Sequence, residues 1–232
     1  MFRHAARAVV VVLALVLLAP AVASAQQSVS FNIGYFAVKG EDSRVDGDAL
    51  AENRSFHLFD IEDFSGFTLG GEWLFPVGEF VEVGAGVGYY QRTVPSIYTD
   101  LVNDNGAEIA QDFKLRVVPI SATVRFLPLG ARSTIQPYVG AGLGIFPWRY
   151  SETGEFVDPD FNIFRGNFVE SGTAVGPLVF GGVRVPVGPA FTLGGEVRWQ
   201  RAEGEFDEPA NFNGDRIDLG GISWQATLGF RF

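Results

Sequence analysis

The carboxy-terminal residues alternate strictly between two kinds of side chain. From position 222 to 232 every odd position is polar or glycine, whereas the even positions are apolar: Ile222, Trp224, Ala226, Leu228, Phe230 and Phe232. Because successive side chains of a strand point to opposite faces, this segment is predicted to be a strand with one apolar and one polar face. Such a strand, ending on an aromatic residue, is typical of the closing strand of a transmembrane β-barrel.

The amino terminus has the three parts of an export signal. Arg3, His4 and Arg7 precede an apolar run over residues 8–19, and Ala23-Ser24-Ala25 is a small-x-small cleavage site. We therefore expect a signal peptide over 1–25 and a mature domain over 26–232. The apolar run is shorter than the ~20 residues that a membrane-spanning helix needs. Only helices and closed barrels satisfy the backbone in lipid, so a mature chain in a membrane must cross it as strands.

Seven further segments alternate in the same way as the last one. The eight segments lie at 29–35, 67–75, 81–89, 118–126, 136–145, 175–185, 191–199 and 222–232. Pro-x-Gly sequences, which suit tight turns, lie at 76–78, 128–130 and 186–188. The fold class predicted from this pattern is an all-β, eight-stranded antiparallel up-and-down transmembrane barrel.

The other four connections are long and acidic. They span 40–65, 93–112, 151–173 and 202–216, and they contain 22 of the 27 acidic residues. Short turns on one side and long loops on the other indicate periplasmic turns and extracellular loops. A ten-stranded barrel is the alternative, if the loop at 40–65 or the loop at 151–173 contributes a hairpin.

Charged residues of both signs lie on the polar faces of the predicted strands and are expected to point into the lumen: Glu72, Glu82, Arg125, Arg184, Glu196, Arg198 and Arg231. An eight-stranded barrel is barely wide enough for its own side chains, so we interpret these charges as a salt-bridge network that plugs the interior. The alternatives are a narrow polar pore through the same residues and a ligand site. Glycines on the inner faces of 81–89 and 136–145 either make room for side chains opposite or leave a small cavity near the loops.

Aromatic residues gather where the strands should meet the two membrane surfaces. Trp73 lies near the predicted turns, and Trp199 and Trp224 lie near the loops. Amphipathic rings prefer these two levels, so we expect all three to be interface residues.

Three motifs carry a resemblance to a known family: Pro137-Tyr-Val-Gly-Ala-Gly-Leu-Gly144, Val83-Gly-Ala-Gly-Val-Gly88 and Leu228-Gly-Phe-Arg-Phe232. With them the mature chain resembles the small outer-membrane β-barrel superfamily that includes the membrane domain of outer membrane protein A and outer membrane protein W. The resemblance implies that Leu228, Phe230 and Phe232 form the signal read by the outer-membrane assembly machinery. These motifs are specific for the barrel class and not for an activity.

Composition excludes several classes of site. The chain has no cysteine, which excludes disulfides, thiolate metal sites and a lipid anchor on cysteine. The acidic loops carry the wrong sign for nucleic acid. Clusters such as Asp60, Glu62 and Asp63, or Asp158 and Asp160, are interpreted as solvated charge, with divalent cations bridging them to lipopolysaccharide as the alternative. We expect no cofactor and no dedicated metal site.

Catalysis is the remaining question. His57 is the single histidine of the mature chain, with Ser55 and Asp60 close to it in sequence. All three lie in one loop with nothing to fix their geometry, so we interpret His57 as a surface residue.

These observations lead to one functional hypothesis and two alternatives. We expect a non-enzymatic protein of the cell outer membrane with a structural or surface-interaction role. A narrow channel or carrier for small molecules is the first alternative, and a lipid-modifying enzyme is the second. Its expected partners are outer-membrane lipids, lipopolysaccharide and the assembly machinery, and the chain is expected to be monomeric.

Overall fold

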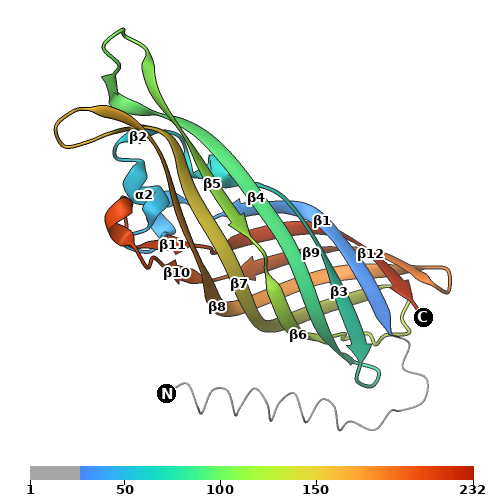
Figure 1. The fold of residues 1–232 in the computed structure, drawn as a ribbon. Helices are drawn as coiled ribbons and strands as arrows, with labels where there is room; N and C mark the ends of the chain where they lie inside the picture. The colour runs from blue at the N-terminus through green and yellow to red at the C-terminus, as the bar shows by residue number, and fades with distance from the viewer. Residues whose placement is uncertain (1–26) are drawn as a thin grey trace, which may run out of the picture.

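A computed structural model describes residues 27–232, and the predicted signal peptide over 1–25 lies outside the described residues. Within 27–232 eight long antiparallel strands close into a ring (Figure 1). In chain order they are β1 (Ser28–Val38), β3 (Gly66–Pro76), β4 (Val81–Val102), β5 (Glu108–Val117) continued by β6 (Ile120–Phe126), β7 (Gln136–Val157), β8 (Ile163–Val187), β9 (Phe191–Gln200) and β12 (Gly221–Arg231). Strand β12 pairs with β9 on one side and with β1 on the other, which leaves the ring without a break. The predicted eight-stranded barrel is therefore confirmed.

Strands β5 and β6 act as one element with an interruption. Pro119 has no amide hydrogen to donate, and the ladder stops at Val118 and Pro119. The neighbouring strands bridge the gap, because Gly88 N donates to Pro119 O at 2.7 Å and Val118 N donates to Pro147 O at 2.9 Å. The alternation of inner and outer side chains continues across the interruption.

One end of the barrel, here called the turn end, has short connections and both ends of the described chain (Figure 1). The turns join β3 to β4, β6 to β7 and β8 to β9. Gly78, Gly130 and Gly188 have φ of 87°, 79° and 76° in these turns. This left-handed conformation is one that L-residues with a side chain rarely adopt, so the Pro-x-Gly sequences place glycine where each turn requires it.

At the opposite end, called the loop end, four strands continue far beyond the others. Strands β4 and β7 have 22 residues each and β8 has 25, whereas about 9–11 residues suffice to cross a bilayer. The segments 93–112 and 151–173, which we predicted as loops, are therefore mostly paired strand that ends in tight tips. The segment 151–173 lengthens β7 and β8, and the segment 40–65 adds only the two-residue strand His57–Leu58 beside β4. Neither adds a hairpin to the ring, so the ten-stranded alternative is wrong.

The other two connections fold over the mouth of the barrel. The first contains η1 (Glu41–Ser43), α2 (Ala49–Asn53), β2 (His57–Leu58) and η2 (Ile61–Phe64), and the second contains β10 (Glu203–Glu205), η3 (Pro209–Asn211) and β11 (Arg216–Asp218). We call these two connections together the cap. Strands β10 and β11 pair with each other in a small separate sheet, and Arg216 of β11 forms an isolated bridge with Asp48 of the first connection. In the described part of the chain no helix is both long and apolar enough to span a membrane.

Large apolar side chains form a band around the outside of the ring. Phe31, Val87, Val124, Leu143 and Val175 are among its exposed members, one on each of five strands. Trp73 lies toward the turn end and stacks on Phe75 with ring centroids 5.3 Å apart. Trp199 and Trp224 are exposed on the same outer wall, toward the loop end. A solvated surface would not favour such a band, and lipid does, so the barrel is a transmembrane one.

Candidate functional site: a barrel interior closed at two levels

The first of the two levels is called the lower level, because it lies nearer the turn end than the cap does. It is a buried ion cluster between β3, β6 and β9. Arg125 donates to the carboxylates of Glu72 and Glu196, the second at 3.2 Å. Arg198 Nε donates to Glu196 Oε1 at 2.9 Å, and its Nη2 lies 3.6 Å from Glu72 Oε2. Thr123 Oγ1 donates to Glu72 Oε1 at 2.6 Å. Two arginines and two glutamates thus share one site, which offsets the large penalty of burying each charge alone.

A second pair lies nearer the turn end. Arg184 donates to Glu82 and, at 2.7 Å, to Gln136 Oε1. Arg231 Nη2 donates to the same Gln136 oxygen at 2.8 Å and makes no ion pair within residues 27–232. Of the seven predicted lumenal charges, four therefore form the central cluster and two form the second pair. The seventh, Arg231, is bound by its hydrogen bond to the side-chain amide of Gln136.

Two aromatic rings complete the lower level. The guanidinium carbon of Arg125 lies 4.7 Å from the centre of the Tyr138 ring and 5.1 Å from that of Phe180. Tyr138 OH donates to Glu196 Oε2 at 3.1 Å. These residues were not among the predicted site residues, although the inward parity of β7 and β8 places them inside. Gly140 makes room for them, because a Cβ there would lie 2.4 Å from Phe180 Cζ.

A small polar cavity of about 50 Å³ lies above the ion cluster. Asn32, Gln225, Ser121 and Arg198 are among its lining residues. The side-chain oxygens of Asn32 and Gln225 are buried without a hydrogen-bond partner within 27–232. Buried amide oxygens of this kind are normally bound by ordered water, for which this volume is sufficient.

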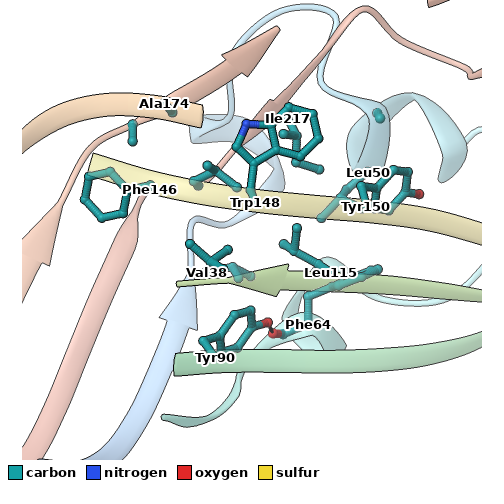
Figure 2. Close-up of a cluster of buried hydrophobic side chains, with 14 of the residues drawn as sticks. Val38, Leu50, Phe64, Tyr90, Leu115, Phe146, Trp148, Tyr150, Ala174 and Ile217 are labelled. Atoms are coloured by element: carbon teal, nitrogen blue, oxygen red, sulfur yellow. Dashed lines mark hydrogen bonds between the residues drawn. The ribbon is translucent and has the colours of Figure 1, made fainter. Parts of the chain in front are cut away.

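The upper level is a hydrophobic core that fills the mouth (Figure 2). Strand residues Leu115, Phe146, Trp148 and Tyr150 point inward and meet cap residues Leu50, Phe64, Phe206 and Ile217. Trp148 stacks on Phe206 with centroids 5.5 Å apart, and Tyr90 OH donates to Phe64 O. We expected a charged lumen, with a small cavity near the loops as one alternative, and did not predict this core. The apolar upper half was missed because the cap sequences are acidic and have no regular period to show which apolar side chains turn inward: Leu50 and Phe64 are buried, whereas Phe56 and Leu58 are exposed.

A buried carboxylate connects the two halves of the cap. Asp48 accepts from Arg44 Nε at 2.6 Å, from Leu50 N at 3.1 Å and from Asp218 N at 2.6 Å. Lys39 pairs with the Asp218 side chain at 2.7 Å. Asp48 is thus the N-cap of α2 and the link between the first and second connections.

A second polar link is centred on Asn53, which is fully buried. Its amide nitrogen donates to Glu152 Oε1 at 2.6 Å and to Tyr150 OH at 3.2 Å, and its oxygen accepts from Asn213 Nδ2 at 2.9 Å. Burial raises the pKa of Glu152, and the hydrogen bonds from Asn53 and Tyr150 oppose that rise. The cap is therefore held to β7 through neutral donors around a carboxyl group.

His57 is buried, so its interpretation as a surface residue was wrong. Its Nδ1 lies 3.0 Å from Asn53 O, and its ring is 4.4 Å from that of Tyr98 and 5.2 Å from that of Phe113. Nε2 is buried without a partner within 27–232. Burial lowers the pKa of His57 more than the Asn53 contact raises it. The geometry does not assemble a triad, because no hydrogen bond of the described residues joins His57 to Ser55 or Asp60.

The acidic clusters have protein partners. Asp158 accepts from Asn162 N at 2.8 Å and from Asn162 Nδ2 at 2.9 Å, and these bonds lower the pKa of the Asp158 carboxyl. Asp63 accepts from the amide of Asp60 at 3.0 Å. No group of three or more histidine, aspartate or glutamate side chains within 27–232 is arranged to hold a metal ion.

Comparison with known proteins finds no matching family model and no matching curated protein. Among solved structures, Neisserial surface protein A aligns with a TM-score of 0.49 at 14% identity, covering 90% of this chain and 98% of that one. Ail of Yersinia pestis, solved with the heparin analogue sucrose octasulfate, aligns at 0.45 and 12%, covering 90% and 99%. Outer Membrane Protein W of E. coli aligns at 0.43 and 14%, covering 90% and 100%.

Scores of this size carry no conclusion about activity, and the fold rests on the strand pairing. That pairing, with the outward apolar band, makes the chain an eight-stranded antiparallel transmembrane β-barrel, the class that its sequence motifs resemble.

Proposed function

We propose that this protein is a non-enzymatic barrel of a bacterial outer membrane, whose closed lumen does not conduct and whose ordered extracellular cap and hairpins take part in surface interactions. The observation that carries the proposal is the closure at two independent levels. An ion cluster fills the lower interior, and a hydrophobic core fills the mouth.

The upper level weighs most against a channel. Ions cross a barrel through water, and the mouth is filled by side chains from the cap and from the strands, several of them fully buried. Among these are Leu50, Phe113, Tyr150 and Ile217. A hydrophobic constriction of this kind blocks ions by excluding water.

The shape of the loop end supports a role at the surface. The β4–β5 and β7–β8 hairpins project beyond the barrel (Figure 1). The strands of β7–β8 are paired up to the tip, and those of β4–β5 are paired with one irregularity between Ile97 and Val102. At the second tip Phe161 is 76% exposed and has a φ of 64°, which is unusual for an aromatic residue. A rigid projection with an exposed ring suits contact with another molecule better than a solvated loop does.

The carboxy terminus supports delivery to the outer membrane. Leu228, Phe230 and Phe232 are all exposed on the outer wall of β12 or directly after it. In this proposal they are read by the assembly machinery as the barrel inserts. The protein works there as a monomer surrounded by outer-membrane lipid and lipopolysaccharide, because the closed ring leaves no strand edge in the membrane.

Planar-bilayer recording of the refolded mature chain tests the proposal. We expect no single-channel openings from the wild type, nor from an Arg125→Ala/Arg231→Ala variant, since the cap core still seals the mouth. Adding Trp148→Ala and Phe206→Ala to that variant removes both levels and should produce openings. Steady openings from the wild type would instead support the narrow channel, whose structural basis would be the polar cavity and the charged lower lumen.

A further inference from the structure

Three cations on the outer wall of the barrel pair with no acidic side chain of the described residues 27–232. Lys114 and Arg116 on β5 and Arg149 on β7 are all exposed. None of them forms an ion pair within residues 27–232, although the chain has a net charge of −10. Other exposed arginines of the loop end do find carboxylates, for example Arg165 with Glu155 at 3.4 Å and Arg201 with Glu203 at 3.1 Å.

The register gathers these cations into one patch. Gln91 lies opposite Arg116 on the neighbouring strand, and Arg116 lies opposite Arg149. In the next row Lys114 stands between Thr93 and Ser151. Their neighbours in sequence, Leu115, Trp148 and Tyr150, point into the core (Figure 2), which sends the cations to the outside. Residues Gln91, Lys114, Arg116 and Arg149 are called the basic patch below.

The basic patch lies at the edge of the lipid-facing band. On β4 the outward residue before Gln91 is Tyr89, whose hydroxyl donates to Gln91 Oε1 at 3.0 Å. Below Arg116 on the same wall comes exposed Ile120, and below Arg149 comes exposed Ile145. The outer wall therefore changes from apolar to cationic within about two outward positions, which is the depth of lipid headgroups.

The arrangement is unfavourable without an anion. Like charges directly opposite each other on adjacent strands are destabilising, and Arg116 and Arg149 are such a pair. The nearest acidic residue on the outward face of β5 is Asp112, which lies two positions from Lys114 and four positions from Arg116 along the strand. A phosphate group between the two guanidinium groups would remove the repulsion through bidentate, charge-assisted hydrogen bonds.

We infer that the basic patch binds the phosphate of an anionic lipid headgroup in the outer leaflet. The inference rests on the membrane placement proposed above. The acyl chains lie along the apolar wall of Val87, Ile120 and Ile145, while the phosphate lies between Arg116 and Arg149. Lys114 and Gln91 supply further donors. Such a lipid would anchor the wall from which both hairpins rise.

The test uses the refolded mature protein in non-ionic detergent, with lipid retention measured by native mass spectrometry. The probes are bisphosphorylated lipid A, the same lipid without phosphates, phosphatidylcholine and inorganic phosphate. The variant is Arg116→Gln/Arg149→Gln. Its matched control is Arg165→Gln/Arg201→Gln, which removes the same charge from exposed positions elsewhere on the loop end.

We expect the wild type and the control to retain bisphosphorylated lipid A about tenfold or more better than the patch variant does, since each charge-assisted bond contributes at least that factor. Dephosphorylated lipid A should bind the wild type as weakly as phosphorylated lipid A binds the variant. In lipid-free detergent the patch variant should melt no lower than the wild type, because a repulsive pair has been removed.

Several outcomes would overturn the inference. Equal retention by the variant and the wild type would exclude the basic patch, and equal retention of phosphatidylcholine would exclude recognition of an anion. Inorganic phosphate that competes at concentrations equal to those of lipid A would show a site for a free anion instead. Failure of the barrel to insert into vesicles of any composition would contradict the membrane placement, whereas loss of lipid A selectivity alone would not.

Discussion

Asp48 and Asp218 are 170 positions apart in the sequence, and a carboxylate oxygen of Asp48 accepts a hydrogen bond from Asp218 N at 2.6 Å. Arg44 reinforces the link, since its Nη2 donates to Asp218 O at 2.9 Å while it pairs with Asp48. The two connections of the cap are therefore a single folded unit, and the closure of the mouth depends on a group that no apolar residue could replace.

Replacing Asp48 should release the cap and leave the barrel intact. The Asp48→Ala change removes the N-cap of α2 and leaves the Arg44 guanidinium buried without its partner, which destabilises by about 3–5 kcal/mol in comparable sites. We expect brief trypsin treatment in micelles to cut at Lys39, Arg44 or Arg54. The Asp215→Ala control, at an exposed carboxylate, should stay resistant. A resistant Asp48→Ala cap would contradict the linking role of this residue.

The cap should loosen in mild acid because His57 is buried in the neutral form. Its folded pKa lies below the unfolded value of about 6.5, so its contribution to stability is present above pH 6.5 and falls as the pH drops toward the folded pKa. The limiting slope is about 1.4 kcal/mol per pH unit. Amide protection factors of residues 50–52 should fall over that range in the wild type. They should fall less in His57→Asn, which keeps a donor to Asn53 O but cannot take up the proton.

Glu152 changes the stability of the cap with pH in the opposite direction. Its folded pKa is raised, so the stability it contributes is present below the unfolded value near 4.5 and is lost as the pH rises through the folded pKa. Comparing His57→Asn with the wild type at each pH cancels this contribution. An identical pH profile for the two proteins would show that His57 does not titrate in the cap.

The ion cluster should be fragile to the loss of its central cation. Arg125→Ala leaves Glu72 and Glu196 buried beside one remaining arginine, and breaking a buried pair from one side destabilises by about 3–5 kcal/mol. Urea unfolding in vesicles measures the loss against Arg165→Ala, whose ion pair is exposed. Equal midpoints for the two variants would mean that the cluster adds nothing to stability.

Position 140 should require glycine because atoms of the neighbouring strands lie too close for a side chain, and not because the backbone makes a turn there. A Cβ there would lie 2.4 Å from Phe180 Cζ and 2.7 Å from the backbone oxygen of Val124, so Gly140→Ala forces a shift on β6 or β8. Such overpacking destabilises by about 1–3 kcal/mol. Gly181→Ala is the control, since its nearest atom is Tyr138 O at 3.6 Å. Similar midpoints for both variants would contradict the tight fit.

Much of the barrel could be predicted from sequence, because alternation reports directly which side chains face lipid. Glu72, Arg125 and Glu196 follow from parity alone, and the turn glycines follow from the Pro-x-Gly sequences. The cap could not be predicted, since its core joins Leu50, Trp148 and Ile217 through contacts between distant segments with no period of their own. For the same reason His57, in an acidic stretch, gave no sign that it would be buried against Phe113.

Cysteine labelling of intact cells decides whether the barrel lies in the outer membrane with an ordered cap over its mouth. The chain has no cysteine, so each introduced thiol reports alone. A membrane-impermeant maleimide should label Phe161→Cys at the hairpin tip. It should label Leu129→Cys in a turn only after the outer membrane is opened. It should leave Leu50→Cys, fully buried in the cap, unlabelled in both cases. Labelling of Leu129→Cys in intact cells would reverse the topology, and rapid labelling of Leu50→Cys would show that the mouth is open.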